Sequence, residues 1–151
     1  MKTIKQSFKL DSDTLNTLNS KQFKRFFDTS KISVFDIETT GLYPKHDKII
    51  LIGSVHIIPG KGDGELVQFF AETPEDEKNI LFEATREICD SDMLITYNGR
   101  SFDMPFLSAR CEKHELPCRN IFNLDLYQLV RNYSTLKNVT VSYTHLTLPT
   151  S

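Results

Sequence analysis

The chain has 151 residues and a formal net charge of -2, which is enough for one domain with a hydrophobic core but short for two. Its composition, 39% hydrophobic and 25% charged, excludes a low-complexity or strongly basic chain. A nucleic-acid partner would therefore need a local basic patch or bound metal ions. Three cysteines without a CxxC pair favour reduced thiols, and no apolar stretch is long enough for a signal peptide or a membrane span. We expect a cytoplasmic protein with no membrane partner.

Residues 1–30 are polar and charged, and we interpret them as an N-terminal helical extension. Leu15, Leu18 and Phe23 follow a loosely helical spacing that would pack on the domain. The basic residues that follow in this segment are more typical of a solvated helix face than of a binding patch.

Strands and helices alternate from residue 31 onwards. The strand-like segments are Ile32–Thr39, Lys48–Ile58, Leu66–Phe70, Met93–Tyr97 and Asn120–Leu124. The helical segments are 74–88, which begins after a Thr-Pro N-cap signal, Asp103–Lys113 and Asp125–Tyr133. The turn-forming stretch PGKGDGE predicts that the second and third strands pair as a hairpin. This order predicts an α/β fold, a mixed five-stranded sheet flanked by helices.

The last eleven residues, Val141–Ser151, do not continue this pattern. The stretch VSYTHLTLPT resembles a translated sequencing-library adapter. A strand-like tail is the alternative, since the β-branched residues would permit it. We interpret Val141–Ser151 as a non-native tail, and we expect the natural protein to continue where it begins, so that the C-terminal part of the domain is missing.

Two carboxylates lie two residues apart in the apolar run SVFDIETTGL. On a strand, Asp36 and Glu38 would project to one face, about 6.6 Å apart along the chain, while Phe35 and Ile37 face the other side. Adjacent like charges repel, and a divalent cation such as Mg²⁺ or Mn²⁺ would compensate them. The alternative is an edge strand that exposes both acids to water. The pattern D-x-E alone favours the exposed edge strand over a metal site.

A second segment, LITYNGRSFDMPFL, ends a strand and begins a helix at Asp103. This position lies beside the carboxyl end of a strand, where open α/β sheets bind ligands. Each residue also has a simpler interpretation: Asp103 as a helix N-cap, Asn98 as a turn former and Phe102 as a core residue.

Together these two segments resemble the first and second motifs of the DEDD 3′–5′ exonucleases, the DnaQ-like branch of the ribonuclease H-like superfamily. The stretch NLDLYQLVRNY further resembles the YprB-like group within it. The resemblance covers most of Lys31–Tyr133, so we expect a partial ribonuclease H-like exonuclease domain over residues 31–140.

The resemblance implies hydrolysis of phosphodiester bonds at the single-stranded 3′ end of DNA or RNA, with two divalent cations, Mg²⁺ or Mn²⁺, as cofactors. The acids that match the catalytic and metal-binding positions are Asp36, Glu38 and Asp103. The residues that match the nucleotide-binding positions are Thr39, Thr40, Gly41, Leu42, Asn98 and Phe102. Asp125 matches a family acid that we expect to support the site without binding metal.

The sequence lacks the family's third motif, a His or Tyr general base followed by a fourth aspartate. His145 lies inside the adapter-like tail with no aspartate after it, and we expect His56 and His114 to be structural. We therefore expect this chain to be inactive or nearly so. A non-catalytic nucleic-acid-binding or interaction module and a structure-selective endonuclease are the alternatives with the same fold.

Overall fold

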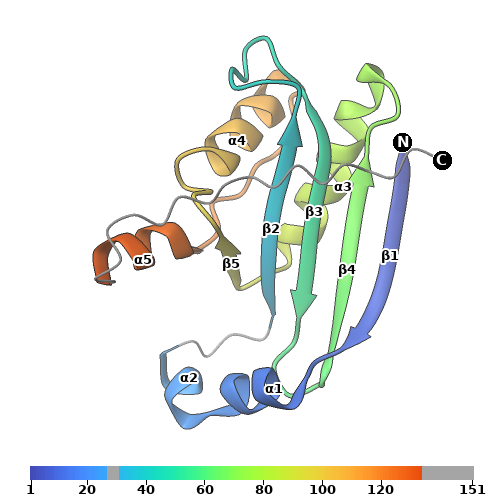
Figure 1. Cartoon of the computed structure of the whole chain (residues 1–151). Coiled ribbons are helices and arrows are strands. Elements are labelled where there is room, and N and C mark those ends of the chain that lie inside the picture. The colour runs from blue at the N-terminus through green and yellow to red at the C-terminus, as the bar shows by residue number, and fades with distance from the viewer. Residues whose placement is uncertain (27–30, 134–151) are drawn as a thin grey trace, which may run out of the picture.

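The computed structural model describes residues 1–26 and 31–133 (Figure 1). The predicted tail Val141–Ser151, with His145 in it, lies outside the described residues. The strands are β1 (Lys2–Lys9), β2 (Ile32–Thr39), β3 (Ile49–Ile57), β4 (Asp63–Phe70), β5 (Met93–Thr96) and β6 (Asn123–Asp125). The helices are α1 (Ser12–Asn19), α2 (Lys21–Phe26), α3 (Glu77–Cys89), α4 (Asp103–Lys113) and α5 (Leu126–Tyr133), and a 3₁₀ turn at Pro74–Asp76 precedes α3.

The strands form one mixed sheet in the order β1-β4-β3-β2-β5-β6. The first four are antiparallel neighbours, and β3 and β4 pair as the predicted hairpin. β2, β5 and β6 run parallel to one another, so the sheet changes from antiparallel to parallel at β2. The predicted mixed α/β sheet is confirmed, with six strands where five were expected.

The additional strand is β1, in the segment predicted to be helical. It pairs with β4 along its whole length, from Lys2 opposite Phe70 to Lys9 opposite Asp63. All of its residues except the half-buried Phe8 are exposed. Backbone hydrogen bonds to β4 hold this edge strand, and neither of its faces is buried. Its sequence therefore does not need the apolar-polar alternation by which a strand is recognised. The helical expectation is wrong for Lys2–Lys9, whereas α1 and α2 do lie within residues 1–30.

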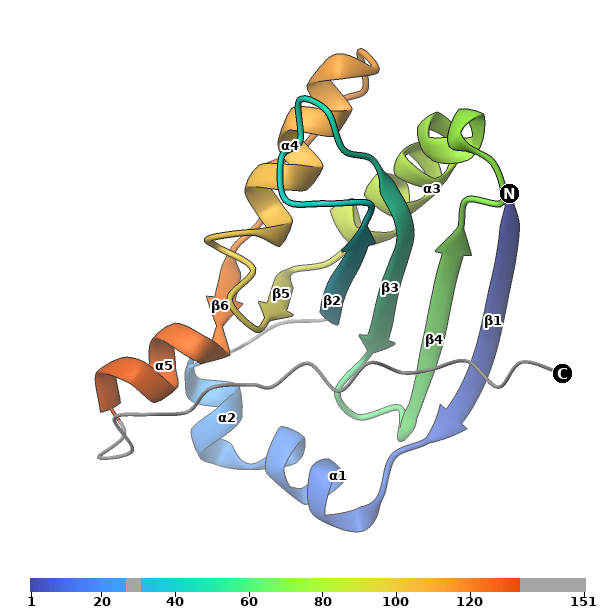
Figure 2. The same cartoon turned by 45° about the horizontal axis from the view of Figure 1, so that its top comes forward.

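Helices α3 and α4 lie together against one face of the sheet (Figure 2). Phe35 and Ile37 of β2 point into the core on this side and are buried, whereas Val34, Asp36 and Glu38, which alternate with them, are exposed. The core residues contributed by the other elements include Ile52, Val67, Phe69, Ile80, Leu81, Leu94, Phe106 and Leu107. The period-two pattern in this part of β2 thus places Phe35 and Ile37 in the core and the two acids, with Val34, on the opposite face.

A second, smaller cluster lies where α1 meets the sheet. It joins Leu18 of α1 to Ile32 of β2 and Met93 of β5, with Phe23 of α2 packed against it. The N-terminal helices therefore cover the start of the parallel half of the sheet. None of the helices in residues 1–26 and 31–133 combines the length and apolar character needed to cross a bilayer.

Substitution of Gly64 by Ala should detach Phe8 from the sheet. A Cβ at Gly64 would lie 2.4 Å from Phe8 Cζ, so the ring must move and β1 loses its half-buried contact. We expect a loss of about 1–2 kcal/mol in the free energy of unfolding, measured by urea denaturation. Gly53→Ala on neighbouring β3 is the matched control, because its Cβ would meet no atom nearer than 4.0 Å. Equal effects of both substitutions would contradict this account of the edge strand.

Candidate functional site

Asp103 is the first residue of α4, and its carboxylate bonds to the sheet. Asp103 Oδ1 accepts a hydrogen bond from the backbone N–H of Ile37 at 3.1 Å. The ladder between β2 and β5 ends at Val34 and Ile95, so Ile37 lies beyond the last paired residue on that side. A buried N–H group needs an acceptor, and Asp103 supplies it. The helix N-cap is Phe102, and no side-chain capping bond is made there, so the N-cap interpretation of Asp103 is wrong.

Asp36 and Asp103 meet at this point although they come from different elements. The side chain of Asp103 is buried, with 5% exposed, and burial together with the charge of Asp36 raises its pKa to about 6. Asp36 is exposed as a residue, yet desolvation of its carboxyl group raises its pKa above the usual value. The interaction between the two carboxyl groups lowers the pKa of Asp36 and raises that of Asp103.

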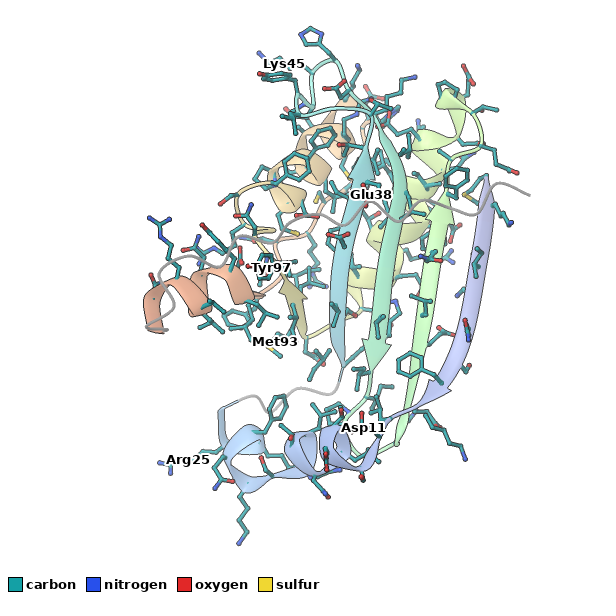
Figure 3. All side chains as sticks on the ribbon, viewed as in Figure 1. Asp11, Arg25, Glu38, Lys45, Met93 and Tyr97 are labelled. Atoms are coloured by element: carbon teal, nitrogen blue, oxygen red, sulfur yellow. The ribbon has the colours of Figure 1, made fainter. Side chains whose placement is uncertain are left out.

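A cavity of about 540 Å³ opens over these two acids. It is lined by Asp36, Ile37, Glu38, Thr39, Leu42, Tyr97, Asn98, Phe102 and Asp103. These residues come from the end of β2, the loop after it, the segment between β5 and α4, and the first residue of α4, in agreement with the strand-end position expected from the sequence. Glu38 and Tyr97, labelled in Figure 3, come from the neighbouring strand ends. The cavity brings together seven of the predicted site residues.

The donor chemistry of the cavity suits a hard divalent cation. Two neighbouring carboxyl groups supply hard oxygen ligands, and a bound cation would offset their repulsion. Glu38 adds a third carboxylate to the lining. Within residues 1–26 and 31–133, however, no three His, Cys, Asp or Glu side chains gather closely enough to form a metal cluster. The residues fit a cation at the Asp36–Asp103 pair, and the three-acid set stays a prediction.

Asp125 organises the turn that follows β5. Its side chain is buried, and its oxygens accept hydrogen bonds from the N–H groups of Asn98 at 2.8 Å, Arg100 at 3.0 Å and Tyr127 at 3.0 Å. Asn98 adopts a φ of 61°, a left-handed conformation that a non-glycine residue rarely takes. Asp125 therefore holds the strained residue that lines the cavity. Asp125 thus contacts the turn without lining the cavity, and its supporting role stays a prediction.

The loop between β2 and β3 carries the predicted nucleotide-binding residues Thr40, Gly41 and Leu42. Of these three, Leu42 lines the cavity and is 71% exposed. Thr40 instead closes the base of the loop, where its N–H donates to Lys48 O and its Oγ1 accepts from Lys48 N–H, both at 2.9 Å. A Cβ on Gly41 would lie 2.5 Å from Asp47 Oδ2, so the close approach of Asp47 requires a glycine. The cavity lining does not include Thr40 or Gly41.

Tyr97 lines the cavity but was absent from the predicted set. It directly follows β5, and its ring packs edge-on against Tyr127 with centroids 5.7 Å apart. Its phenol oxygen is buried with no hydrogen-bond partner in the described part of the chain. A buried unpaired hydroxyl is uncommon in folded proteins. The sequence signal that could have identified it is its position immediately before Asn98 in the second motif.

Neither of the two histidines expected to be structural lines the cavity. His56 is buried on β3, with Nδ1 2.6 Å from Ser33 Oγ and Nε2 3.0 Å from Ser54 Oγ, and burial lowers its pKa. His114 follows α4, and its Nε2 lies 2.9 Å from Glu77 Oε2. Both side chains are engaged in hydrogen bonds within the protein.

Comparison with known families assigns the chain to a superfamily. The model of a family in the RNase H superfamily matches residues 33–146, which is most of the chain. The chain therefore belongs to the RNase H superfamily, and the ribonuclease H-like fold expected from the two motifs is confirmed.

Two curated relatives are PolC-type DNA polymerases III. That of Ureaplasma parvum serovar 3 is 34% identical over an alignment of 115 positions, which covers 62% of this chain and 8% of the polymerase. That of Clostridium perfringens is 46% identical over 52 residues, which are 34% of this chain and 3% of the polymerase. The chain thus spans less than a tenth of the length of these relatives.

Solved structures share the fold at low sequence identity. A family B DNA polymerase of the archaeon Pyrobaculum calidifontis aligns with a TM-score of 0.56 and 23% identity over 68% of this chain and 16% of that chain. A product-bound exonuclease I aligns with a TM-score of 0.56 and 15% identity over 68% of this chain and 31% of that chain. These similarities show the fold alone.

Replacing Asp103 by Asn should stabilise the metal-free protein at neutral pH. The folded-state pKa of about 6 lies above the ordinary value of 3.8, so folding disfavours the ionised form. This penalty is absent below pH 4, grows as the pH rises to 6 and is complete above it, at about 1–3 kcal/mol. An asparagine oxygen can still accept the Ile37 N–H.

The measurement is urea unfolding in a chelator at pH 4 and pH 7.5. We expect Asp103→Asn to exceed the wild-type free energy of unfolding at pH 7.5 and to approach it at pH 4. Glu112→Gln, an exposed acid on the same helix, is the matched control. A gain of equal size at both pH values would contradict the raised pKa.

Tyr97→Phe should also raise stability. The substitution removes a buried hydroxyl with no partner among the described residues and keeps the ring that packs on Tyr127. We expect a gain of up to about 1 kcal/mol in the free energy of unfolding. A loss above that size in thermal or urea unfolding would show that the hydroxyl has a partner in the folded protein.

Proposed function

We propose that the chain is the nuclease-site part of a metal-dependent 3′–5′ exonuclease that hydrolyses phosphodiester bonds at single-stranded nucleic-acid ends. The observation that carries the proposal is the cavity lined by Asp36, Glu38 and Asp103 together with Leu42, Asn98 and Phe102. Carboxylates that hold metal ions would bind the phosphate, and the apolar side chains around the same opening would contact the base.

In this proposal Asp36 and Asp103 would hold a divalent cation, Mg²⁺ or Mn²⁺, and Glu38 would complete the ligand set for a second one. Such ions would generate the attacking hydroxide and relieve charge on the leaving 3′ oxygen. They would also attract the phosphate to a protein of net charge -2. The protein's own part is to fix the acids on two rigid elements, the end of β2 and the beginning of α4.

The terminal nucleotides would be held by shape and stacking. Leu42 is exposed at the rim of the cavity, and Phe102 lines it while its ring packs at 5.5 Å on the buried Phe106. An apolar residue at the rim and an aromatic ring supported from the core can contact a base of any identity. The proposed binding is therefore independent of sequence, and Thr39 and Asn98 would contact the sugar-phosphate backbone from the two strand ends.

The comparisons support the nuclease class and the type of substrate. The chain shares a fold with exonuclease I, which has been solved with product, with single-stranded DNA and with a dA16 oligonucleotide. A non-catalytic binding module remains the alternative, because the described residues supply no fourth aspartate with a general base beside these three acids.

The decisive experiment is a nuclease assay on the chain extended to the natural stop codon of its gene. A 5′-labelled single-stranded DNA or RNA oligonucleotide with Mg²⁺ should yield a ladder shortened from the 3′ end. We expect Asp103→Asn to reduce the rate at least 100-fold, because the acids act as a unit. The 151-residue chain should bind the oligonucleotide but cleave it slowly or not at all.

Glu112→Gln controls for the lost charge, since it lies on the same helix as Asp103 but is exposed outside the cavity. Cleavage that survives Asp103→Asn would contradict the proposed site. Metal-dependent binding without cleavage by the extended chain would favour the binding module.

A further inference from the structure

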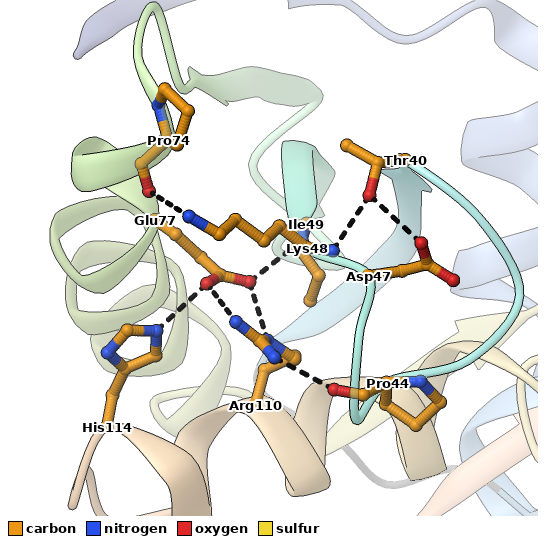
Figure 4. Close-up of polar contacts among 9 residues, drawn as sticks. All are labelled: Thr40, Pro44, Asp47, Lys48, Ile49, Pro74, Glu77, Arg110 and His114. Carbon is orange, nitrogen blue, oxygen red and sulfur yellow. Dashed lines mark hydrogen bonds and ion pairs between the residues drawn. The ribbon is translucent and has the colours of Figure 1, made fainter.

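A buried ion pair between α3 and α4 lies next to the loop that carries Leu42. Glu77 of α3 and Arg110 of α4 are each 1% exposed. Arg110 Nε donates to Glu77 Oε1 at 2.7 Å, and Arg110 Nη2 donates to Glu77 Oε2 (Figure 4). Burial would raise the pKa of Glu77, but its hydrogen bonds from Arg110, His114 and the Ile49 N–H outweigh burial and lower it. The pair is therefore ionised and bidentate.

The same pair also bonds to the beginning of β3 and to the loop that precedes it. Glu77 Oε1 accepts from the Ile49 N–H at 2.9 Å, at the first residue of β3. Arg110 Nη1, the remaining guanidinium nitrogen, donates to Pro44 O at 2.8 Å. One guanidinium thus connects α3 and α4 to the middle of the loop between β2 and β3.

The hydrogen bond to Pro44 anchors the middle of this loop from outside, whereas Lys48 Nζ, at the end of the loop, donates to Pro74 O at 3.3 Å. In the described part of the chain, the other hydrogen bonds of residues 41–47 are made within the loop or to its two ends. Tyr43 N–H, for example, donates to Asp47 Oδ2 at 2.8 Å, and Asp47 N–H donates to Tyr43 O at 2.8 Å. These contacts give the loop its own shape, and Arg110 fixes that shape relative to α4.

Resting on the proposed function, we propose that Arg110 is a positioning residue for the binding of a nucleic-acid 3′ end. Asp103 begins α4, and Arg110 lies two turns further along the same helix. Helix α4 therefore positions two parts of the cavity. Its first residue, Asp103, bonds to the end of β2, and Arg110 bonds to the loop whose Leu42 also lines the cavity.

Stability alone does not account for such a pair. Apolar residues of similar volume often replace a buried ion pair without loss of stability. Apolar residues have no hydrogen-bond donors, and the three donors of a lysine share one nitrogen, so neither reproduces the three separate nitrogens with which Arg110 bonds Glu77 and Pro44. The planar fork of Arg110 meets a carboxylate and a carbonyl at once, which favours a geometric role.

The test variant is Glu77→Gln combined with Arg110→Met. Glutamine can still accept the Ile49 N–H, and methionine fills the core without leaving a buried charge unpaired. Arg86→Met, an exposed arginine paired with Glu83 on α3, is the matched control. Arg110→Lys provides a second variant that keeps a cation opposite Glu77, should the double variant fail to fold by circular dichroism.

Three quantities are measured on the 151-residue chain. The first is Mn²⁺ affinity, which should stay within twofold because Asp36 and Asp103 are untouched. The second is amide hydrogen exchange at Tyr43 and Asp47, which should become at least tenfold faster while the β3 amides keep their protection. The third is the affinity for a 3′-hydroxyl DNA oligonucleotide in Mn²⁺, read by fluorescence anisotropy, which should fall about tenfold.

An oligonucleotide affinity within twofold of wild type overturns the inference, whatever the exchange data show. A weakened affinity with unchanged loop exchange also overturns it, because Arg110 would then act by another route. If the wild-type chain has no oligonucleotide affinity, the proposed function fails, and the exchange data alone decide whether Arg110 holds the loop.

Discussion

The hydrogen bond from the Ile37 N–H to Asp103 is the contact on which the site depends. β5 is short and leaves β2 unpaired on one side after Val34. The carboxylate of Asp103 takes the place of the missing strand and satisfies a backbone donor that would otherwise be buried without a partner. As a result, α4 begins at a fixed position over the end of β2. A second acid, Asp36, then lies beside the first, and their repulsion is the cost that a bound cation would relieve.

Periodicity determined the elements that could be predicted. The bounds of β2 and α4 agree with the expected Ile32–Thr39 and Asp103–Lys113 because each has a clear apolar pattern and a clear boundary signal. The alternation within β2 also placed Asp36 and Glu38 on the face opposite the core. Most of the predicted cavity lining followed from these two elements and their order.

Other features depend on partners far away in the chain and could not be predicted in this way. β1 is an exposed edge strand whose pairing with β4 leaves no mark on its own composition. Glu77 and Arg110 meet across 33 positions, and each alone is an ordinary charged residue on a helix. Gly41 belongs to a recognisable sequence motif, but the close approach of the Asp47 carboxylate, which leaves little room for a side chain there, is visible only in the folded loop.

The bonds of Asp125 also set an order of assembly. Residues 2–70 contain the antiparallel half of the sheet, β1 to β4, whereas the turn at Asn98 is held by a carboxylate 27 positions later. During synthesis from the N-terminus, the hairpin strands can pair while the strained turn still lacks its acceptor. The cavity should therefore take its final form only after the last strand has been added. A nascent chain would therefore pair the antiparallel half of its sheet before the cavity is complete.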